Sequence, residues 1–259
     1  MDRLHAGPSV RLACQLRPRS DTAVLPLLPP DIGASETRRR DYFKASDIEL
    51  FVAIMFVDIR RSTALVEKRL PYDVVFLLNH FFDAVAGAVV DTGGMPNQFV
   101  GDGMMAIFGM NTDAEAACRQ ALEAARLIDW HLAEMNRSLA NELPQPITVG
   151  IGIHAGDVIV GTMGYREHAQ TTAIGEAVHV ASRLQDLTKE YNCQLAISDV
   201  VGTAAGVPLD DFPRHDIQVR GLSAPLSIRT IDSAAALAQH DPSSPDDQDN
   251  IVQIYAQSR

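Results

Sequence analysis

The chain has 259 residues and a formal net charge of -11, from 22 lysines and arginines against 33 aspartates and glutamates. Hydrophobic residues make up 46% of it and charged residues 21%, which excludes a fully disordered chain. A general electrostatic attraction to nucleic acids is also excluded, because that attraction rests on positive side chains. No apolar run approaches the roughly 20 residues of a membrane-spanning helix. The three cysteines form no Cys-x-x-Cys pair, so neither a zinc site nor a disulfide framework is expected. We therefore expect a cytoplasmic globular protein with no membrane segment in this chain and no nucleic-acid partner.

Composition divides the chain into three segments. Residues 1–47 contain a proline-rich stretch, Pro26–Pro30, and predict a linker or the remnant of a preceding domain. Residues 48–232 alternate strand and helix patterns and predict the folded domain. Residues 233–259 are rich in alanine, serine, aspartate and proline, which is typical of a flexible acidic tail.

The folded segment begins with a predicted strand and a predicted helix. Glu49–Val57 is apolar enough for a strand that is buried on both faces. Tyr72–Val90 repeats apolar residues at helical spacing. Pro71 suits the first turn of this helix, and the Gly93–Gly94 pair predicts its end.

A hairpin and a second helix follow. The runs Gln98–Val100 and Met104–Phe108 flank Gly101-Asp102-Gly103, and an Asp-Gly pair between apolar runs is a strong hairpin pattern. Asp113–Leu139 again repeats apolar residues at helical spacing, which predicts a long helix.

The last part of the domain is predicted to contain strands around one helix. The runs Ile147–His154 and Val158–Thr162 predict two strands that turn at Gly156-Asp157, and Glu176–Tyr191 predicts a helix. The closing strands are expected near Leu195–Ile197, Ile217–Val219 and Leu226–Ile231. This order predicts an α+β, ferredoxin-like sandwich, in which helices pack on a mostly antiparallel sheet.

Two carboxylates are placed where chemistry could occur. Asp58 follows the first strand and Asp102 lies in the hairpin turn, so the fold could bring both to one point. Like charges that close repel unless a cation lies between them, and Mg²⁺ prefers carboxylate and phosphate oxygens. The alternative is structural: Asp102 suits a turn, and Asp58 could cap the next helix.

Four blocks of sequence resemble the catalytic domain of class III nucleotidyl cyclases, in the order and with the spacing of that family. The blocks are Phe56–Thr63, Gly93–Gly109, Ile151–Gly156 and Thr172–Gln185. The resemblance implies the cyclase fold across residues 48–232. It also implies a signalling enzyme that converts a nucleoside triphosphate, ATP or alternatively GTP, to a 3′,5′-cyclic monophosphate and pyrophosphate.

The resemblance also implies a metal site. The side chains of Asp58 and Asp102 and the carbonyl of Ile59 match the family's ligands for two Mg²⁺ or Mn²⁺ ions. One ion would lower the pKa of the ribose 3′ hydroxyl, and the other would offset charge on the leaving pyrophosphate.

Three further positions match residues that act on the phosphates and the ribose. Arg183 matches the arginine that contacts the α-phosphate in the transition state, where a guanidinium can bridge oxygens whose charge grows. Arg220 falls near the basic residue for the terminal phosphates, which is a looser match. His179 replaces the family's ribose-orienting asparagine, and this departure predicts slower turnover or none.

The base-reading positions also depart from the commonest pattern. Gln98 replaces the adenine-selecting lysine, and Thr172 replaces the aspartate that often accompanies it. A glutamine amide both donates and accepts, so it could pair with adenine or, after a flip, with guanine. The residue types therefore leave the base open, and ATP is expected from the resemblance.

The family builds each active site from two subunits, and this chain carries both sets of residues. We therefore expect a homodimer with two equivalent sites and an inactive monomer. The alternative is a cyclase-like dimerisation module that binds nucleotide without turnover. A diguanylate cyclase is discounted, because the Gly-Gly-Asp/Glu-Glu-Phe signature is missing.

A weaker resemblance lies near the N-terminus. Arg11–Gln15 is similar to the last cluster-ligand segment of adrenodoxin-type 2Fe–2S ferredoxins. Such a cluster needs four thiolates, and the other three are missing. Either the match is chance, or the chain was cut from a longer protein in which a ferredoxin domain precedes the cyclase.

Overall fold

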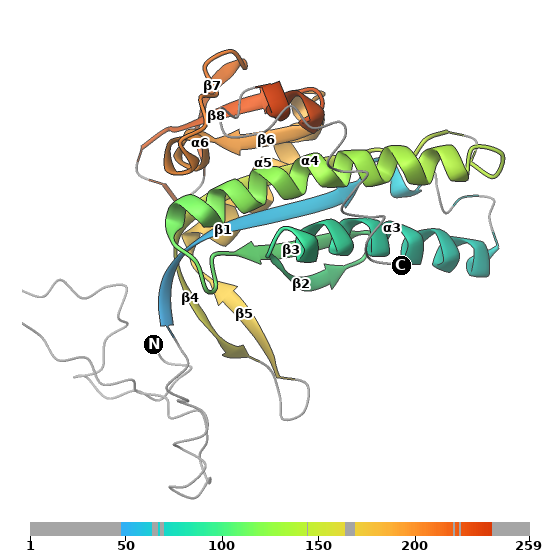
Figure 1. Ribbon diagram of the computed structural model, residues 1–259, viewed down its shortest axis with the longest axis horizontal. Coiled ribbons are helices and arrows are strands. Elements are labelled where there is room, and N and C mark those ends of the chain that lie inside the picture. The colour runs from blue at the N-terminus through green and yellow to red at the C-terminus, as the bar shows by residue number, and fades with distance from the viewer. Residues whose placement is uncertain are drawn as a thin grey trace, which may run out of the picture. The chain divides into compact units, whose positions relative to one another are not determined.

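The computed structural model describes residues 48–63, 67, 70–143, 145–163, 169–219, 221–222 and 224–239. In these residues an eight-stranded sheet carries helices on both faces (Figure 1). The strands are β1 (Ile48–Ile59), β2 (Met95–Val100), β3 (Gly103–Phe108), β4 (Val149–Met163), β5 (Gln170–Ile174), β6 (Leu195–Ser198), β7 (Arg214–Ile217) and β8 (Leu226–Ile231). The helices are α3 (Pro71–Asp91), α4 (Ala114–Ser138), α5 (Glu176–Glu190), α6 (Asp199–Ala205) and the 3₁₀ helix η4 (Ala234–Gln239).

The sheet is mostly antiparallel, as the sequence predicts. Its strand order is β2-β3-β1-β4-β6-β8-β7, with β5 paired to β4, and only the β4–β6 pair is parallel. Two helices, α3 and α4, pack over one face, and α5 covers part of the other. The α+β sandwich is therefore confirmed.

Strand β1 lies at the centre of the sheet and positions the predicted site. Met55 alternates with Ile54 along it: Met55 packs into the core under α3 and α4, and Ile54 packs into the core under α5. Successive residues of a strand point to opposite faces, so Asp58 lies on the same face as Ile54. The first carboxylate therefore lies on the α5 face, at the end of the strand.

The two long helices form for the reasons that the sequence gives. Pro71 occupies the first turn of α3, and the Asp113 carboxylate caps α4 by accepting a hydrogen bond from the Ala116 N–H at 2.8 Å. Among the described residues, α3 is the one helix that meets the length and composition of a membrane span. Its Leu77 and Phe81 are nonetheless buried in the domain core.

One predicted turn is wrong. Strand β4 runs without interruption from Val149 to Met163, and Gly156 and Asp157 pair in register with β1. A Cβ on Gly156 would lie 3.3 Å from the Cβ of Ala177 on α5. The glycine therefore allows the helix to approach the strand closely, and it does not mark a turn.

Other differences occur at the ends of the domain. The strand expected at Ile217–Val219 lies at Arg214–Ile217, and α6 was not predicted. Residues 234–239, which the sequence assigned to the tail, form η4, and Ala234 and Leu237 are buried. The predictions for residues 1–47, including the ferredoxin-like segment, and for the tail from residue 240 onward lie outside the described residues.

Candidate active site

The two predicted metal-binding carboxylates lie side by side. Asp58 is opposite Gly103 in the β1–β3 register, and the Ile59 N–H donates to the Asp102 carbonyl at 3.4 Å. Burial raises the pKa of Asp58 above its ordinary value, and the nearby negative charge of Asp102 raises it further. Two distant parts of the sequence thus bring two carboxylates together at the end of β1, and this pair is called the Asp58–Asp102 site below.

The Asp58–Asp102 site has the chemistry that suits a divalent cation. The Lys189 Nζ lies 3.3 Å from the Asp58 Oδ2, so a positive group already neighbours the carboxylate. A Cβ on Gly103 would lie 3.2 Å from the Asp58 Oδ1, so the glycine keeps space free beside that oxygen. The described residues contain no group of three metal-ligating side chains. Two carboxylates and a carbonyl would leave positions for phosphate and water oxygens, which Mg²⁺ prefers.

Lys189 should compete with a metal ion for Asp58. Replacing it by methionine removes the ammonium, and we expect the Kd for Mn²⁺, measured by titration calorimetry, to fall about fivefold, since a partly exposed ion pair contributes about 1 kcal/mol. Lys189→Arg keeps the charge and should keep the wild-type Kd. An unchanged Kd in Lys189→Met would show that the ammonium does not compete.

The two base-reading residues also come together. Gln98 lies on β2 and Thr172 on β5, and the Gln98 Nε2 donates to the Thr172 Oγ1 at 3.2 Å. The Thr172 hydroxyl in turn donates to the Asn97 Oδ1 at 2.8 Å. Sequence reasoning missed Asn97, although it is adjacent to Gln98.

The two predicted catalytic residues lie elsewhere. His179 and Arg183 are four residues apart on α5, so they share one face of the helix, and both are exposed. Ala181 and Leu184 lie on the buried side of α5. His179 and Arg183 therefore point away from the sheet that carries Asp58. Arg183 donates to the Glu190 Oε1 at 2.9 Å. Arg220 lies outside the described residues.

Arg60 is a structural residue that sequence reasoning did not identify. Its guanidinium donates to the carbonyls of Val149, at 3.2 Å, Thr188, at 2.9 Å, and Cys193. Burial lowers the pKa of Arg60 from its ordinary value, and the charge of Arg61 adds to this effect. Arg60, two residues after Asp58, thus links the end of β1 to β4 and to the end of α5. The Arg60-Arg61 pair was visible in the sequence, but nothing there distinguished the two arginines.

Arg60→Met should destabilise the domain because three carbonyls lose a charged donor. We expect the free energy of unfolding, measured with urea, to fall by about 3 kcal/mol. The exposed neighbour Arg61 provides a matched control, and Arg61→Met should change the free energy of unfolding little. Equal losses in both variants would contradict the assigned role.

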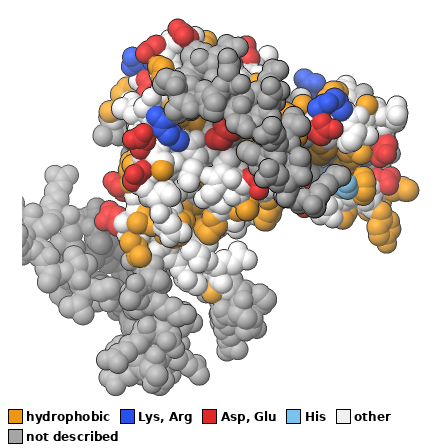
Figure 2. All heavy atoms as spheres, in the orientation of Figure 1, with side chains coloured by type: hydrophobic (Ala, Val, Ile, Leu, Met, Phe, Trp, Pro, Cys, Tyr) orange, Lys and Arg blue, Asp and Glu red, His pale blue; other side chains and the backbone are white. Residues whose placement is uncertain are grey.

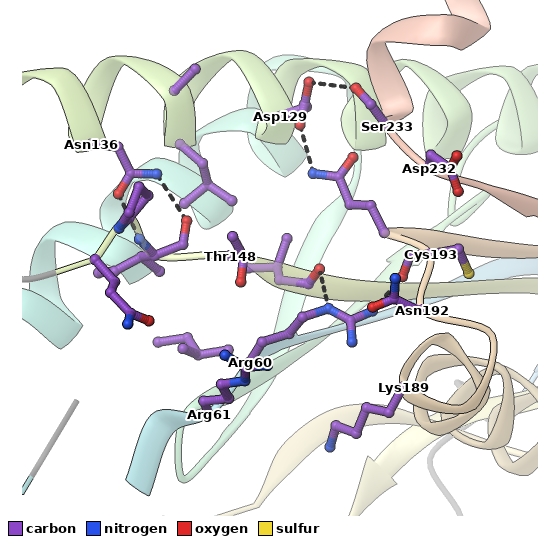
Figure 3. Close-up of a pocket in the computed structure, with 18 residues that line it drawn as sticks. Arg60, Arg61, Asp129, Asn136, Thr148, Lys189, Asn192, Cys193, Asp232 and Ser233 are labelled. Carbon is purple, nitrogen blue, oxygen red and sulfur yellow. Dashed lines mark hydrogen bonds between the residues drawn. The ribbon is translucent and has the colours of Figure 1, made fainter. Parts of the chain in front are cut away.

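A pocket of about 1040 Å³ lies next to the end of β1, where Ile59 and Arg60 line it (Figure 3). Of the predicted site residues that the structure describes, only Ile59 lines it, together with Lys189, which the sequence analysis did not predict. Its polar side chains largely satisfy one another: Asp129, for example, accepts from Gln194 at 2.6 Å and from Ser233 at 3.2 Å. The pocket therefore lies next to the predicted active site and is not lined by Asp58 or Asp102.

Comparisons with known proteins identify the family of this chain. The profile of the "Adenylate and Guanylate cyclase catalytic domain" family matches residues 46–223. An adenylate cyclase of Anabaena cylindrica is 34% identical over 218 residues, which cover 82% of this chain and 36% of the relative. The chain thus spans about a third of that protein's length.

Solved structures give the same result. The guanylyl cyclase Cya2 aligns with a TM-score of 0.62 and 27% identity, covering 72% of this chain and 93% of that one. The adenylyl cyclase CyaB from P. aeruginosa aligns with a TM-score of 0.59 and 26% identity, covering 72% and 96%. The family match, the relative and both folds lead to one conclusion: this chain belongs to the class III adenylate and guanylate cyclase family.

Proposed function

We propose that this domain is an adenylate cyclase, which converts ATP to 3′,5′-cyclic AMP and pyrophosphate. The observation that carries the proposal is the meeting of the Asp58 and Asp102 carboxylates at the end of β1, with the Lys189 ammonium beside them. The adenylate cyclase of Anabaena cylindrica supports ATP as the substrate, whereas the guanylyl cyclase Cya2 is the reason to test GTP.

Each residue would have a defined part in the reaction. The ribose 3′ oxygen attacks the α-phosphorus, and the bond to pyrophosphate breaks as the new ester bond forms. Asp58 and Asp102 would hold two Mg²⁺ or Mn²⁺ ions, with the Ile59 carbonyl as a further ligand; such ions lower the pKa of a hydroxyl and offset phosphate charge. The Arg183 guanidinium would donate to the α-phosphate oxygens as their charge grows.

The remaining residues would position the substrate. His179 can hydrogen-bond the ribose, although it is shaped differently from an asparagine amide. Gln98 and Thr172, which already contact each other, would bind the base. Arg220 would contact the terminal phosphates.

A homodimer would complete the site. The carboxylates lie beside the part of α5 that carries Lys189, whereas Arg183 is exposed on the outer face of that helix, so a second chain would supply the arginine. Large apolar side chains are exposed beside the β2–β3 turn, at Phe99 and Val100. Others are exposed on the ribbon formed by β4 and β5, at Ile159, Met163 and Ile174. The ribbon projects from the body in Figure 1, and Figure 2 shows hydrophobic side chains along the same side. Contact with a second copy would cover apolar surface of this kind.

The second candidate function is a nucleotide-binding regulatory module with little or no turnover. The exposed His179, in place of an asparagine, and Gln98, in place of a lysine, favour it. The intact pair of carboxylates opposes it, because a module that only binds would not need to bring two repelling charges together.

A product assay separates these functions. The purified chain is incubated with ATP or GTP, each with Mn²⁺ and separately with Mg²⁺, and the nucleotides are resolved by chromatography beside an Asp58→Ala control. Cyclic AMP that disappears in the control is the expected result. Cyclic GMP instead would overturn the base assignment, and bound nucleotide without any product would overturn the enzyme assignment.

A further inference from the structure

Three hydrogen bonds connect Asn97, Thr172 and Gln98 into a chain with one direction. The Asn97 Nδ2 donates to the backbone carbonyl of Thr171, the Thr172 hydroxyl donates to the Asn97 Oδ1 at 2.8 Å, and the Gln98 Nε2 donates to the Thr172 Oγ1 at 3.2 Å. Thr172 is buried, Asn97 is half-buried, and Gln98 is exposed. This series of hydrogen bonds therefore runs from the β5 backbone to a glutamine amide at the surface.

The carbonyl of Thr171 fixes which groups donate and which accept in this series of hydrogen bonds. A carbonyl can only accept, so the Asn97 amide must turn its NH₂ group toward it and its oxygen toward Thr172. The Thr172 hydroxyl must then donate to Asn97, which leaves its lone pairs to accept from Gln98. The Gln98 amide consequently has one orientation, with its nitrogen next to Thr172 and its oxygen farther away.

This orientation presents a definite pattern to an approaching base. From the far end of the Gln98 amide to the Thr172 hydroxyl, the groups are an acceptor (Oε1), a donor (the second Nε2 hydrogen) and an acceptor (the remaining Oγ1 lone pair). The base-pairing edge of adenine offers the C2–H, the N1 acceptor and the N6 donor, which complements this pattern. The edge of guanine offers two donors and then the O6 acceptor, so it mismatches at two of the three positions.

A flipped Gln98 would reverse this preference. Without Asn97 as its acceptor, the Thr172 hydroxyl could donate to the Gln98 Oε1, and the glutamine NH₂ would then point outward. The pattern would become donor, acceptor, acceptor from the far end, which complements the O6, N1 and N2 groups of guanine. The side chain that prevents the flip is Asn97.

We infer that Asn97 is a specificity-determining residue, which holds Gln98 in the adenine-reading orientation and so selects ATP over GTP. The inference rests on the proposed nucleotide cyclase function and names the residue behind its base preference. Asn97 acts through Thr172 and Gln98, so it is a positioning residue.

The test compares kcat/KM for ATP and GTP in the full chain. Asn97→Leu keeps the size of the side chain but removes both of its hydrogen bonds, and the ATP-to-GTP ratio should fall at least about tenfold, as expected for the loss of a paired base contact. Asn97→Asp still accepts from the Thr172 hydroxyl and should keep the wild-type ratio. Asn79→Leu, on the exposed surface of α3, is the matched control and should change neither the ratio nor the rate.

Further outcomes separate this inference from the proposed function. If Asn97→Leu fails to fold, Thr172→Val is tested instead. It removes the hydroxyl that links Asn97 to Gln98 and should lower the ATP-to-GTP ratio as well. If the wild-type chain forms no product, the proposed function fails, and equilibrium binding of ATP and GTP to the same variants still tests the role of Asn97. A folded Asn97→Leu variant with the wild-type ATP-to-GTP ratio would overturn the inference, as would a wild-type preference for GTP.

Discussion

Mixing Asp102→Ala chains with Arg183→Ala chains should restore about a quarter of the wild-type activity, although each variant alone should be inactive. In a random mixture half of the dimers are mixed, and each mixed dimer holds one intact site out of two. The structure gives the reason, because Asp102 lies next to Asp58 at the end of the sheet, whereas Arg183 lies on the outer face of α5. Cyclic nucleotide formation, measured against the mixing ratio, tests the expectation.

A second mixture is the control. Asp58→Ala and Asp102→Ala damage the same half of the site, so every site in their mixed dimers lacks one carboxylate, and no activity should return. Recovery in this control, or no recovery in the first mixture, would contradict a site shared between two chains.

Asp58→Asn should lower the turnover rate at least about 1000-fold and at the same time stabilise the metal-free domain at neutral pH. In the proposed mechanism the amide would no longer carry the charge that attracts Mg²⁺, and the metal-assisted activation of the 3′ hydroxyl would be lost. The stabilisation follows from the pKa of Asp58, which burial and the charge of Asp102 raise in the folded state. Activity assays and thermal unfolding without metal measure the two effects, with Asp83→Asn on the exposed surface of α3 as the control.

The pH dependence of this stability has a definite sign. A carboxyl whose pKa is raised by folding contributes stability below its unfolded pKa and loses it as the pH rises through the folded pKa. The stabilising effect of Asp58→Asn should therefore be present at neutral pH and disappear in acid. An Asn variant that is less stable than the wild type at pH 7 would show that the Lys189 ion pair outweighs burial and repulsion.

The long elements could be predicted from the sequence, and the reasons are local. The apolar spacing of Tyr72–Val90, with Pro71 before it, is confirmed as α3. Asp113 was predicted as the first residue of a helix and is the N-cap of α4. The Asp102-Gly103 pair correctly predicted the β2–β3 hairpin, since few other residues suit such a turn.

The errors arose where long-range packing outweighs local preference. Gly156-Asp157 has the composition of a turn, yet β1 pairs with both residues and α5 packs on the glycine. Helix α6 is short, and its burial of Val201 and Ala205 depends on the neighbouring strands and helices. The end of the domain was placed too early because the alanines of η4 resemble a tail until α4 covers them.

The sequence by itself determined the fold class and the family resemblance, because residue order, apolar periodicity and a tight turn are local properties. It predicted the meeting of Asp58 with Asp102 through the expected neighbourhood of the first strand and the hairpin, which the β1–β3 pairing provides. Only the tertiary structure decided what surrounds those carboxylates. Lys189 reaches Asp58 across 131 positions of the chain, and Thr172 reaches Asn97 across 75. Contacts at such separations depend on how α5 and β5 pack against the sheet, and no local pattern encodes the direction of a hydrogen bond.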